Sequence, residues 1–239
     1  MLRLTFRHHY DFGEDTGLVD GDLVREGTWD AMRTQTSGPF AIADDRAQLE
    51  RYAEGRVELE RRAAVILALA RDREADSIVS YGAGTGLLEH WMVRLGPGDI
   101  ALTLTDYAPA TVERLVTLFP DARVVAHDLR TGPLAPGALH LFHRIDAELD
   151  GQAWRQVLQR FGAVPVLFVA TEVASTRRLL AELRVRVQAP HAARAGFLRN
   201  RAAFEALWSK THDASFVQVA DLEGWLLEPK MTAGRERRA

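Results

Sequence analysis

"SYGAGTGLLEHW" (residues 80–91) contains three glycines at alternate positions, between an apolar segment and a segment with helical periodicity. Gly82, Gly84 and Gly86 suit a backbone that turns tightly or approaches a ligand closely. They do not complete the dinucleotide fingerprint G-x-G-x-x-G, because Leu87 stands where its third glycine belongs, and the loop lacks the lysine of a phosphate-binding Walker motif. A tight turn without a ligand is the alternative explanation of the loop.

Short apolar runs follow the glycine loop at regular intervals and alternate with helix-like stretches. Such alternation predicts parallel strands covered by helices. The predicted strands are 77–81, 100–106, 122–128, 138–146 and 164–172. The link 129–137 holds two prolines and two glycines, so we expect a crossover without a helix and the strand order 3-2-1-4-5. Two final runs, 215–221 and 224–230, are too close for a helical connection and predict a hairpin whose last strand is antiparallel.

The chain is expected to divide at about residue 75. Residues 1–74 predict an irregular and helical cap or lid, with a long helix that begins at Asp44 or Asp45 and runs to about Arg71. Residues 1–43 show no strand pattern. Residues 75–239 predict the sheet-containing core, with a basic helical insert at about 173–200 and a disordered tail.

Composition excludes several classes of protein. The 239 residues have 47% hydrophobic and 26% charged side chains, as in ordinary globular proteins. The sequence has no cysteine, which rules out disulfides, zinc–thiolate sites, iron–sulfur clusters and cysteine nucleophiles. Neither a signal peptide nor a membrane span is apparent, so a cytoplasmic protein without a membrane partner is expected. A net charge of −3 makes nucleic acid an unlikely partner.

Two acids end predicted strands at the same edge of the sheet as the glycine loop. Asp106 closes the second strand and Asp128 closes the third. Ligands of open parallel sheets bind at this edge, where a carboxylate accepts hydrogen bonds from ribose hydroxyls. The structural alternatives are a helix cap for Asp106 and a turn former for Asp128. The shared edge favours a ligand site.

The segments "VSYGAGTGLLE", "TLTDYAP" and "VVAHDL", in this order and spacing, resemble the class I S-adenosylmethionine (SAM)-dependent methyltransferases. The resemblance covers residues 77–230 and implies an α/β fold: a doubly wound, mostly parallel seven-stranded sheet of order 3-2-1-4-5-7-6 whose last strand is antiparallel, with an N-terminal helical extension. It also implies SAM as the cofactor. The cofactor-binding residues carried over are Tyr81, Gly82, Gly84, Gly86, Asp106, Tyr107, Asp128, Leu129, His143 and Arg144.

One position departs from the family pattern. The family usually has an acid two residues before the first glycine, which interacts with the amino end of the methionine part, and here that residue is Ser80. Either Glu89 or a residue of the N-terminal segment takes over this interaction, or the affinity for the cofactor is reduced. Loss of cofactor binding is a further alternative.

Candidate catalytic residues follow the fourth predicted strand in "HRIDAELD" (143–150). His143 and Asp146 are the candidate bases, with packing and helix capping as their structural alternatives. No metal site is expected, because His140, His143 and Asp146 are three apart and a strand would turn them to opposite faces. The aromatic residues that we consider for an acceptor pocket are Trp29, Phe40, Tyr52 and Phe197, and "RHHYD" (7–11) is a candidate for the lid.

The resemblance leaves more than one function open. The leading hypothesis is methyl transfer to an oxygen or nitrogen of a small-molecule metabolite, which would carry an anionic group if the arginines of 177–201 contact it. The alternatives are an RNA methyltransferase that uses this basic stretch and a non-catalytic cofactor-binding protein of the same fold. A nicotinamide oxidoreductase is disfavoured by Leu87 and by the predicted hairpin.

Overall fold

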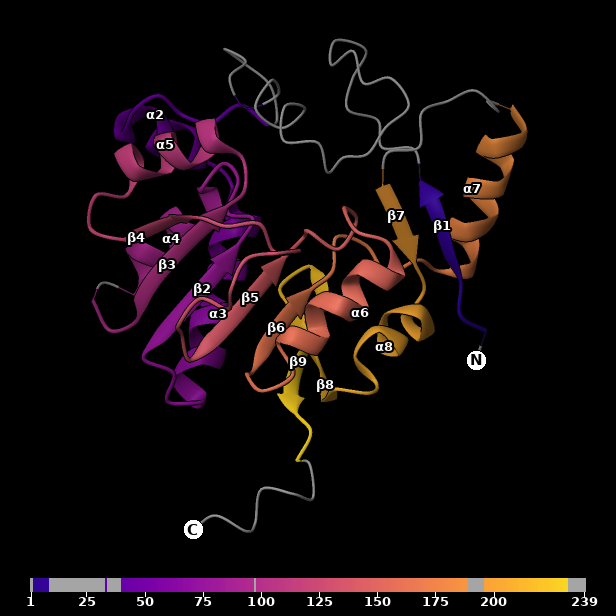
Figure 1. The fold of residues 1–239 in the computed structure, drawn as a ribbon. Helices are drawn as coiled ribbons and strands as arrows, with labels where there is room; N and C mark the ends of the chain where they lie inside the picture. The colour runs from indigo at the N-terminus through magenta and orange to yellow at the C-terminus, as the bar shows by residue number, and fades with distance from the viewer. Residues whose placement is uncertain (1, 9–32, 34–39, 97, 189–195, 232–239) are drawn as a thin grey trace.

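A computed structural model describes residues 2–8, 33, 40–96, 98–188 and 196–231 (Figure 1). Its centre is a seven-stranded sheet of order β4-β3-β2-β5-β6-β9-β8, in which β9 runs antiparallel to both β6 and β8. This confirms the predicted order and the antiparallel hairpin. The strands are β2 (Ser77–Tyr81), β3 (Ala101–Asp106), β4 (Arg123–Ala126), β5 (Leu139–His143), β6 (Val166–Val169), β8 (His212–Val219) and β9 (Leu222–Pro229).

Helices cover both faces of this sheet. Figure 1 shows α6 (Gly151–Arg160) and α8 (Arg201–Trp208) in front of it. Trp154 of α6 and Phe204 of α8 are buried there, and both rings contact Phe168 of β6. The opposite face packs on four helices: α2 (Arg46–Ala53), α3 (Val57–Asp72), α4 (Leu87–Leu95) and α5 (Pro109–Leu118). The alternating apolar side chains of β2 and β5 therefore enter two separate layers of the core.

The N-terminal part of the chain corrects the expectation of one long helix. The single helix predicted to run from Asp44 or Asp45 to Arg71 is two helices, α2 and α3, separated by Gly55 at φ 74°. A left-handed residue cannot continue an α-helix, and glycine adopts this conformation without strain. Asp45 is the N-cap, since its carboxylate accepts a 2.7 Å hydrogen bond from the backbone N–H of Gln48.

Two short strands form a second sheet that sequence patterning missed. β1 (Thr5–His8) pairs antiparallel with β7 (Gly196–Arg199), so residues 1–43 are not wholly irregular. The basic insert expected to be helical over 173–200 is helical over α7 (Thr176–Gln188) and then contributes β7. Each strand is four residues long, too short for an alternation pattern, and is stabilised by its distant partner. Trp29, His9–Asp11 and the tail 232–239 lie outside the described residues.

The described residues contain neither a candidate membrane span nor a candidate metal site. No helix among them is long and apolar enough to cross a membrane. Nor do they contain a group of three or more His, Asp or Glu side chains placed to hold a metal ion.

Candidate functional site

The glycine loop joins the end of β2 to the start of α4 in a conformation that other residues adopt only with strain. All three glycines have left-handed φ angles, 68° at Gly82 and 62° at Gly84, with Gly86 as the N-cap of α4. A Cβ atom on Gly82 would lie 2.8 Å from Cγ2 of Ile145. The loop backbone has no side chains at these glycines and therefore packs directly against neighbouring groups, as a ligand-binding turn requires.

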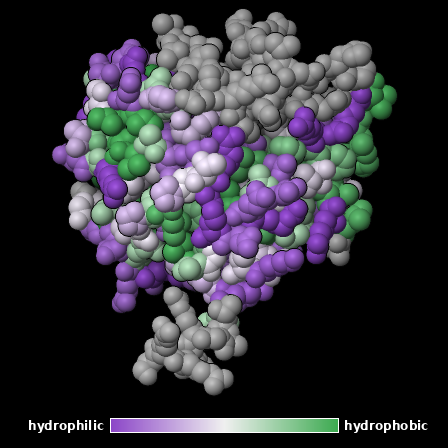
Figure 2. Space-filling model, viewed as in Figure 1, coloured by the Kyte–Doolittle hydropathy of each residue, from purple (hydrophilic) through white to green (hydrophobic). Residues whose placement is uncertain are grey.

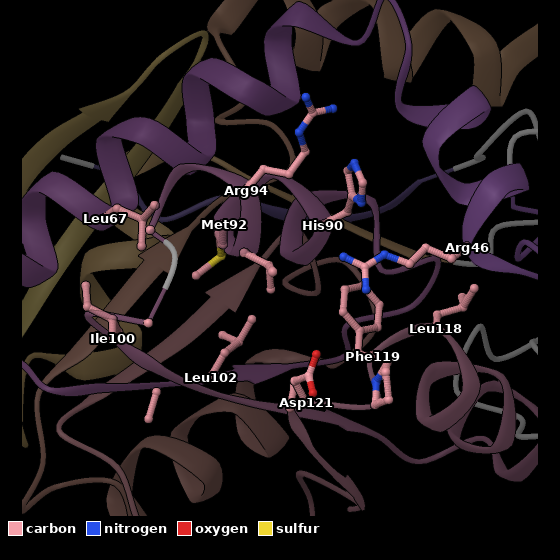
Figure 3. Close-up of a pocket in the computed structure, with 16 residues that line it drawn as sticks. Arg46, Leu67, His90, Met92, Arg94, Ile100, Leu102, Leu118, Phe119 and Asp121 are labelled. Carbon is pink, nitrogen blue, oxygen red and sulfur yellow. The ribbon is translucent and has the colours of Figure 1, made fainter.

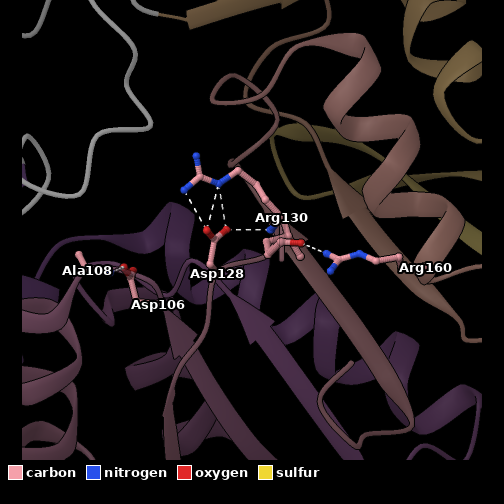
Figure 4. A network of polar contacts seen from close by, with 6 residues as sticks. Asp106, Ala108, Asp128, Arg130 and Arg160 are labelled. Atoms are coloured by element: carbon pink, nitrogen blue, oxygen red, sulfur yellow. Dashed lines mark hydrogen bonds and ion pairs between the residues drawn. The ribbon is translucent and has the colours of Figure 1, made fainter. Parts of the chain in front are cut away.

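Asp106 ties the end of β3 to this loop. Its side chain is 5% exposed, and its two carboxylate oxygens each accept a 3.0 Å hydrogen bond. Oδ2 accepts from the N–H of Gly84, and Oδ1 accepts from the N–H of Ala108, which Figure 4 shows beside it. A carboxylate offers about four acceptor positions, so further donors can still bind. Asp106 thus supports the loop and presents acceptor capacity at the carboxyl edge of the sheet.

A small cavity of about 50 Å³ opens beside Asp106, and we call it the small cavity. Many of the residues predicted to bind a cofactor line it together. These are Tyr81, Gly82, Asp106, Tyr107, Asp128 and Leu129. The structure therefore gathers, at one point, residues that the sequence scatters over about 50 positions.

Asp128 and its loop are fixed by two arginines (Figure 4). Arg130 donates from Nε to Oδ1 at 3.0 Å and from Nη2 to Oδ2 at 2.9 Å. Partial burial acts to raise the pKa of Asp128, but the hydrogen bonds from Arg130 outweigh it and the pKa is lowered. Arg160 of α6 donates to the carbonyl oxygens of Leu129 and Gly132, which holds the turn that carries Asp128.

A second cavity of about 280 Å³, the large cavity, lies on the other side of the glycine loop. Ser80 and Glu89 both line it and both are buried, and the hydroxyl of Ser80 donates a 2.6 Å hydrogen bond to Oε1 of Glu89. Burial raises the pKa of Glu89 to about 7, against the lowering effect of the Ser80 hydrogen bond. An acid therefore stands beside Ser80, although it comes from the helix and not from the strand.

Arg33 lies between the two cavities and lines both. Its guanidinium rests on the glycine loop, where Nη1 is 2.5 Å from the position that a Cβ of Gly84 would occupy. The carbonyl of Arg33 accepts a 3.1 Å hydrogen bond from the N–H of Ile42, which connects it to the start of the α2 region. Sequence reasoning missed this residue, because it lies in a stretch without periodicity or motif.

Glu148 is the second residue that the sequence did not single out, although it belongs to the quoted "HRIDAELD". It lines both cavities. Burial, together with the negative charge of Asp106, raises its pKa to about 8. A carboxyl group with this pKa exchanges a proton near neutral pH, which suits an acid or base.

The two candidate catalytic residues take different places. His143 lines the large cavity, burial lowers its pKa to about 3, and its Nε2 has no hydrogen-bond partner among the described residues. Asp146 lines neither cavity. Its Oδ1 accepts hydrogen bonds from the N–H and the hydroxyl of Thr171, at 2.6 and 2.7 Å, so the carboxylate holds the end of β6.

The other residues predicted to bind the cofactor or the acceptor lie in different parts of the structure. Gly84 and Arg144 line the large cavity, whereas Gly86 lines neither cavity and packs against the ring of Phe119. Of the aromatic candidates, Phe40 lines the large cavity. Tyr52 packs in the core below α5, and Phe197 lies under the guanidinium groups of Arg7 and Arg199.

No family model matches this sequence, and no curated protein matches it. Its three-dimensional structure is similar to several solved ones. Human N-acetylserotonin methyltransferase in complex with SAM aligns over 85% of this chain and 56% of its own, with a TM-score of 0.59 and 17% identity. A putative O-methyltransferase from Nostoc punctiforme PCC 73102 aligns over 75% and 59%, with a TM-score of 0.56 and 12% identity. A structure described as PigF with SAH aligns over 66% and 53%, with a TM-score of 0.54 and 15% identity. The chain thus spans a little over half the length of these proteins and shares their fold.

Proposed function

We propose that this chain, which has the fold of the class I SAM-dependent methyltransferases, binds SAM and transfers its methyl group to an oxygen or nitrogen of a small molecule. The observation that carries the proposal is the small cavity, where Asp106, Tyr107, Asp128 and Leu129 meet beside the glycine loop. The structural neighbours described as bound to SAM or to S-adenosylhomocysteine (SAH) support the choice of cofactor.

The residues present fit SAM, and each part of the cofactor has a partner. Asp106 would accept hydrogen bonds from the ribose hydroxyls, while Tyr107, Leu129 and Asp128 would contact the adenine. Glu89, with Ser80 beside it, would bind the ammonium group in place of the missing strand acid. Arg33 would bind the carboxylate of the methionine part.

When bound, SAM supplies an electrophilic methyl group on a sulfonium. The chain contributes orientation, which is worth up to about 7–11 kcal/mol when the reacting groups are held in line. Glu148 would take the proton of an acceptor hydroxyl or amine, because its raised pKa matches that task better than the low pKa of His143. His143, neutral at physiological pH, would offer a hydrogen bond to the acceptor.

The large cavity supports a small acceptor. Its volume is about 280 Å³, and because the methionine part of SAM would fill the portion beside Glu89 and Arg33, the remainder has room only for a small acceptor. Arg56 and Arg144 line it, as does Arg62, which forms a two-point ion pair with Asp221. Guanidinium groups at the cavity favour an acceptor with an anionic group. The neighbours described as O-methyltransferases favour an oxygen nucleophile.

The RNA alternative has less support, because the basic stretch is not a free arginine face. Arg178 is ion-paired with Glu172, and Arg186 with Glu182. The outer side of α7 also exposes apolar side chains, visible as green at the right edge of Figure 2: Leu180, Leu183 and Val187. They interrupt the two exposed arginines of this helix, Arg177 and Arg184, so α7 lacks the continuous cationic face that favours phosphate binding.

Residues 1–74 are proposed to cap the site. Arg33 and Phe40, both from this part of the chain, line the large cavity, and Arg33 reaches the small one too. A cap of this kind would exclude water from the reacting groups and shape the acceptor side.

Calorimetric titration of the purified chain with SAH, and with NAD in a parallel cell, tests the proposed function. We expect micromolar binding of SAH and none of NAD. Binding of NAD alone, or of neither compound, would contradict the proposal. Turnover is then tested by transfer of labelled methyl groups from SAM to hydroxylated and amino-substituted aromatic acids.

The first testable prediction concerns pH. Burial raises the pKa of Glu89 to about 7, and the ammonium group of SAH binds only the ionised carboxylate of Glu89. SAH affinity should therefore fall about tenfold per pH unit below about pH 7. The folded-state pKa lies above the ordinary 4.5, so the free chain is stabilised below about pH 4.5 and loses this contribution as the pH rises through about 7. Because SAH binds more tightly when Glu89 is ionised, SAH should raise Tm more at about pH 8 than at about pH 6. Glu89→Gln should weaken SAH binding and flatten its pH profile, as measured by calorimetry at several pH values; an unchanged profile would remove Glu89 from the site.

The second prediction distinguishes contacts to the carboxylate end of the cofactor from contacts to its adenosine end. Arg33→Ala should weaken SAH binding at least about 10-fold, because a charge-assisted hydrogen bond is worth about 1.5–3 kcal/mol. Adenosine lacks the carboxylate, so its affinity should stay within about twofold. Arg51→Ala, an exposed arginine of α2 that lines neither cavity, is the matched control. Equal losses for SAH and adenosine would assign Arg33 a role in the fold of the loop instead.

A further inference from the structure

A third cavity lies on the α4 and α5 side of the sheet, at the amino end of β3 and therefore at the edge opposite Asp106 (Figure 3). We call it the α4–α5 cavity. Its volume is about 290 Å³, as large as the large cavity. The apolar part of its wall comes from Leu67 of α3, Met92 of α4, Leu102 of β3, and Leu118 and Phe119 at the end of α5. Space of this size beside apolar side chains is suited to the apolar body of a ligand.

A buried polar group marks one part of this wall. His90 is 4% exposed, and its Nε2 has no hydrogen-bond partner among the described residues. Buried polar atoms in folded proteins are almost always hydrogen-bonded, and an exception needs an explanation. Nε2 itself is covered by neighbouring atoms, but because His90 lines the α4–α5 cavity, a ligand whose polar head displaces this cover would supply the absent partner.

The charges around the cavity are unevenly distributed. In Figure 3, the guanidinium of Arg46 lies between His90 and Phe119, Arg94 is on the same side as His90, and Asp121 is on the other side of the cavity. Burial and the positive charge of Arg94 hold the pKa of His90 below its usual value, although Glu50 acts in the opposite direction, so the imidazole is neutral near pH 7. A neutral imidazole donates a hydrogen bond from one nitrogen and accepts one at the other.

We propose that the α4–α5 cavity is a second binding site, for a small monocarboxylate with an apolar body. The carboxylate is placed beside Arg46 and His90, which provide a charge-assisted and a neutral hydrogen bond. The apolar body lies against Met92, Leu102 and Phe119. Asp121 repels a second negative charge, so a dicarboxylate is disfavoured. This site shares no lining residue with the small cavity and is independent of the proposed methyl transfer.

Calorimetric titration of the full chain with octanoate tests this inference, with octanol as the uncharged ligand of the same length. We expect saturable octanoate binding and at least about tenfold weaker binding of octanol. Arg46 lies 4.0 Å from Glu50 in an exposed ion pair of the free chain, so its contribution to carboxylate binding is modest, and Arg46→Ala should reduce octanoate affinity about fivefold. Leu102→Trp, which fills the cavity, should abolish binding. Arg51→Ala, a change on the same helix away from the cavity, should leave the affinity unchanged.

The outcomes are distinct from those for the proposed function. Absence of saturable octanoate binding overturns the inference, and so does equal octanoate affinity of Arg46→Ala and the unchanged chain. Arg46 lies on the surface, so the Arg46→Ala comparison stands even if Leu102→Trp does not fold. Failure to bind SAH would contradict the proposed function and leave the octanoate measurement unaffected.

Discussion

The Asp106→Ala variant is expected to bind SAH about 100-fold or more weakly than the unchanged chain. The carboxylate accepts hydrogen bonds from the N–H groups of Gly84 and Ala108, and in the proposed complex it also accepts two from ribose. A hydrogen bond to a charged group contributes about 1.5–3 kcal/mol, and loss of two such bonds exceeds the roughly 2.7 kcal/mol that corresponds to 100-fold. The loop also loses the support that shapes it.

Calorimetry with SAH and with adenosine measures this effect, and both ligands should lose affinity because both contain the ribose. Asp213→Ala is the matched control, since Asp213 lies on β8 with a side chain that is 77% exposed. The SAH affinity of Asp106→Asn should lie between that of Asp106→Ala and that of the unchanged chain, because the amide keeps one acceptor oxygen. Normal SAH affinity in Asp106→Ala would contradict the placement of the cofactor in the small cavity.

The largest expected loss of stability follows the substitution Arg199→Leu. Arg199 is fully buried on β7, and its guanidinium donates to the carbonyl oxygens of Asp146, at 2.6 Å, and of Leu149. The same group lies 5.4 Å from the ring of Phe197. Leucine would leave the carbonyl of Leu149 without this donor in the core, so we expect the free energy of unfolding to fall by about 3–5 kcal/mol.

Urea denaturation followed by far-UV circular dichroism measures this change. Arg201→Ala is a suitable control two residues away, because Arg201 forms a partly exposed ion pair with Glu223 and should cost at most about 1 kcal/mol. Similar losses in the two variants would mean that Arg199 does not hold the 146–149 loop. Since Glu148 lies in that loop, a destabilised Arg199→Leu chain should also bind the acceptor poorly.

The sheet could be predicted from the sequence because its signals are local. The runs around Val79 and Leu141, the glycine loop and the short 129–137 link each restrict the backbone within a few residues. Together these constraints left one strand order, which the structure confirms. The candidate cofactor-binding residues could be proposed from the sequence for the same reason, since Asp106 ends β3 and Asp128 follows the end of β4 at the same edge of the sheet.

The parts that the sequence did not reveal depend on distant contacts. β1 exists because Thr5–His8 pairs with residues almost 200 positions later, and no local pattern encodes that pairing. Arg33 reaches the glycine loop from a stretch without periodicity. Glu148 becomes a candidate base only through its burial near Asp106, which raises its pKa. Asp146, in contrast, was the acid that the sequence favoured as a base, but its carboxylate accepts hydrogen bonds from Thr171 and lines neither cavity.

The pairing of β1 with β7 has a consequence for how the acceptor side can change during evolution. The chain is attached at Thr5–His8 by pairing with β7 and again from Ile42 onward by packing below α5, so the described structure fixes it at both of these points. The entropy of closing a loop grows only with the logarithm of its length, and a doubling costs about 0.6 kcal/mol. A change of length between the two anchors is therefore expected to cost little folding free energy, and selection for a new acceptor can use such changes as long as Arg33 and Phe40 keep their places at the cavities.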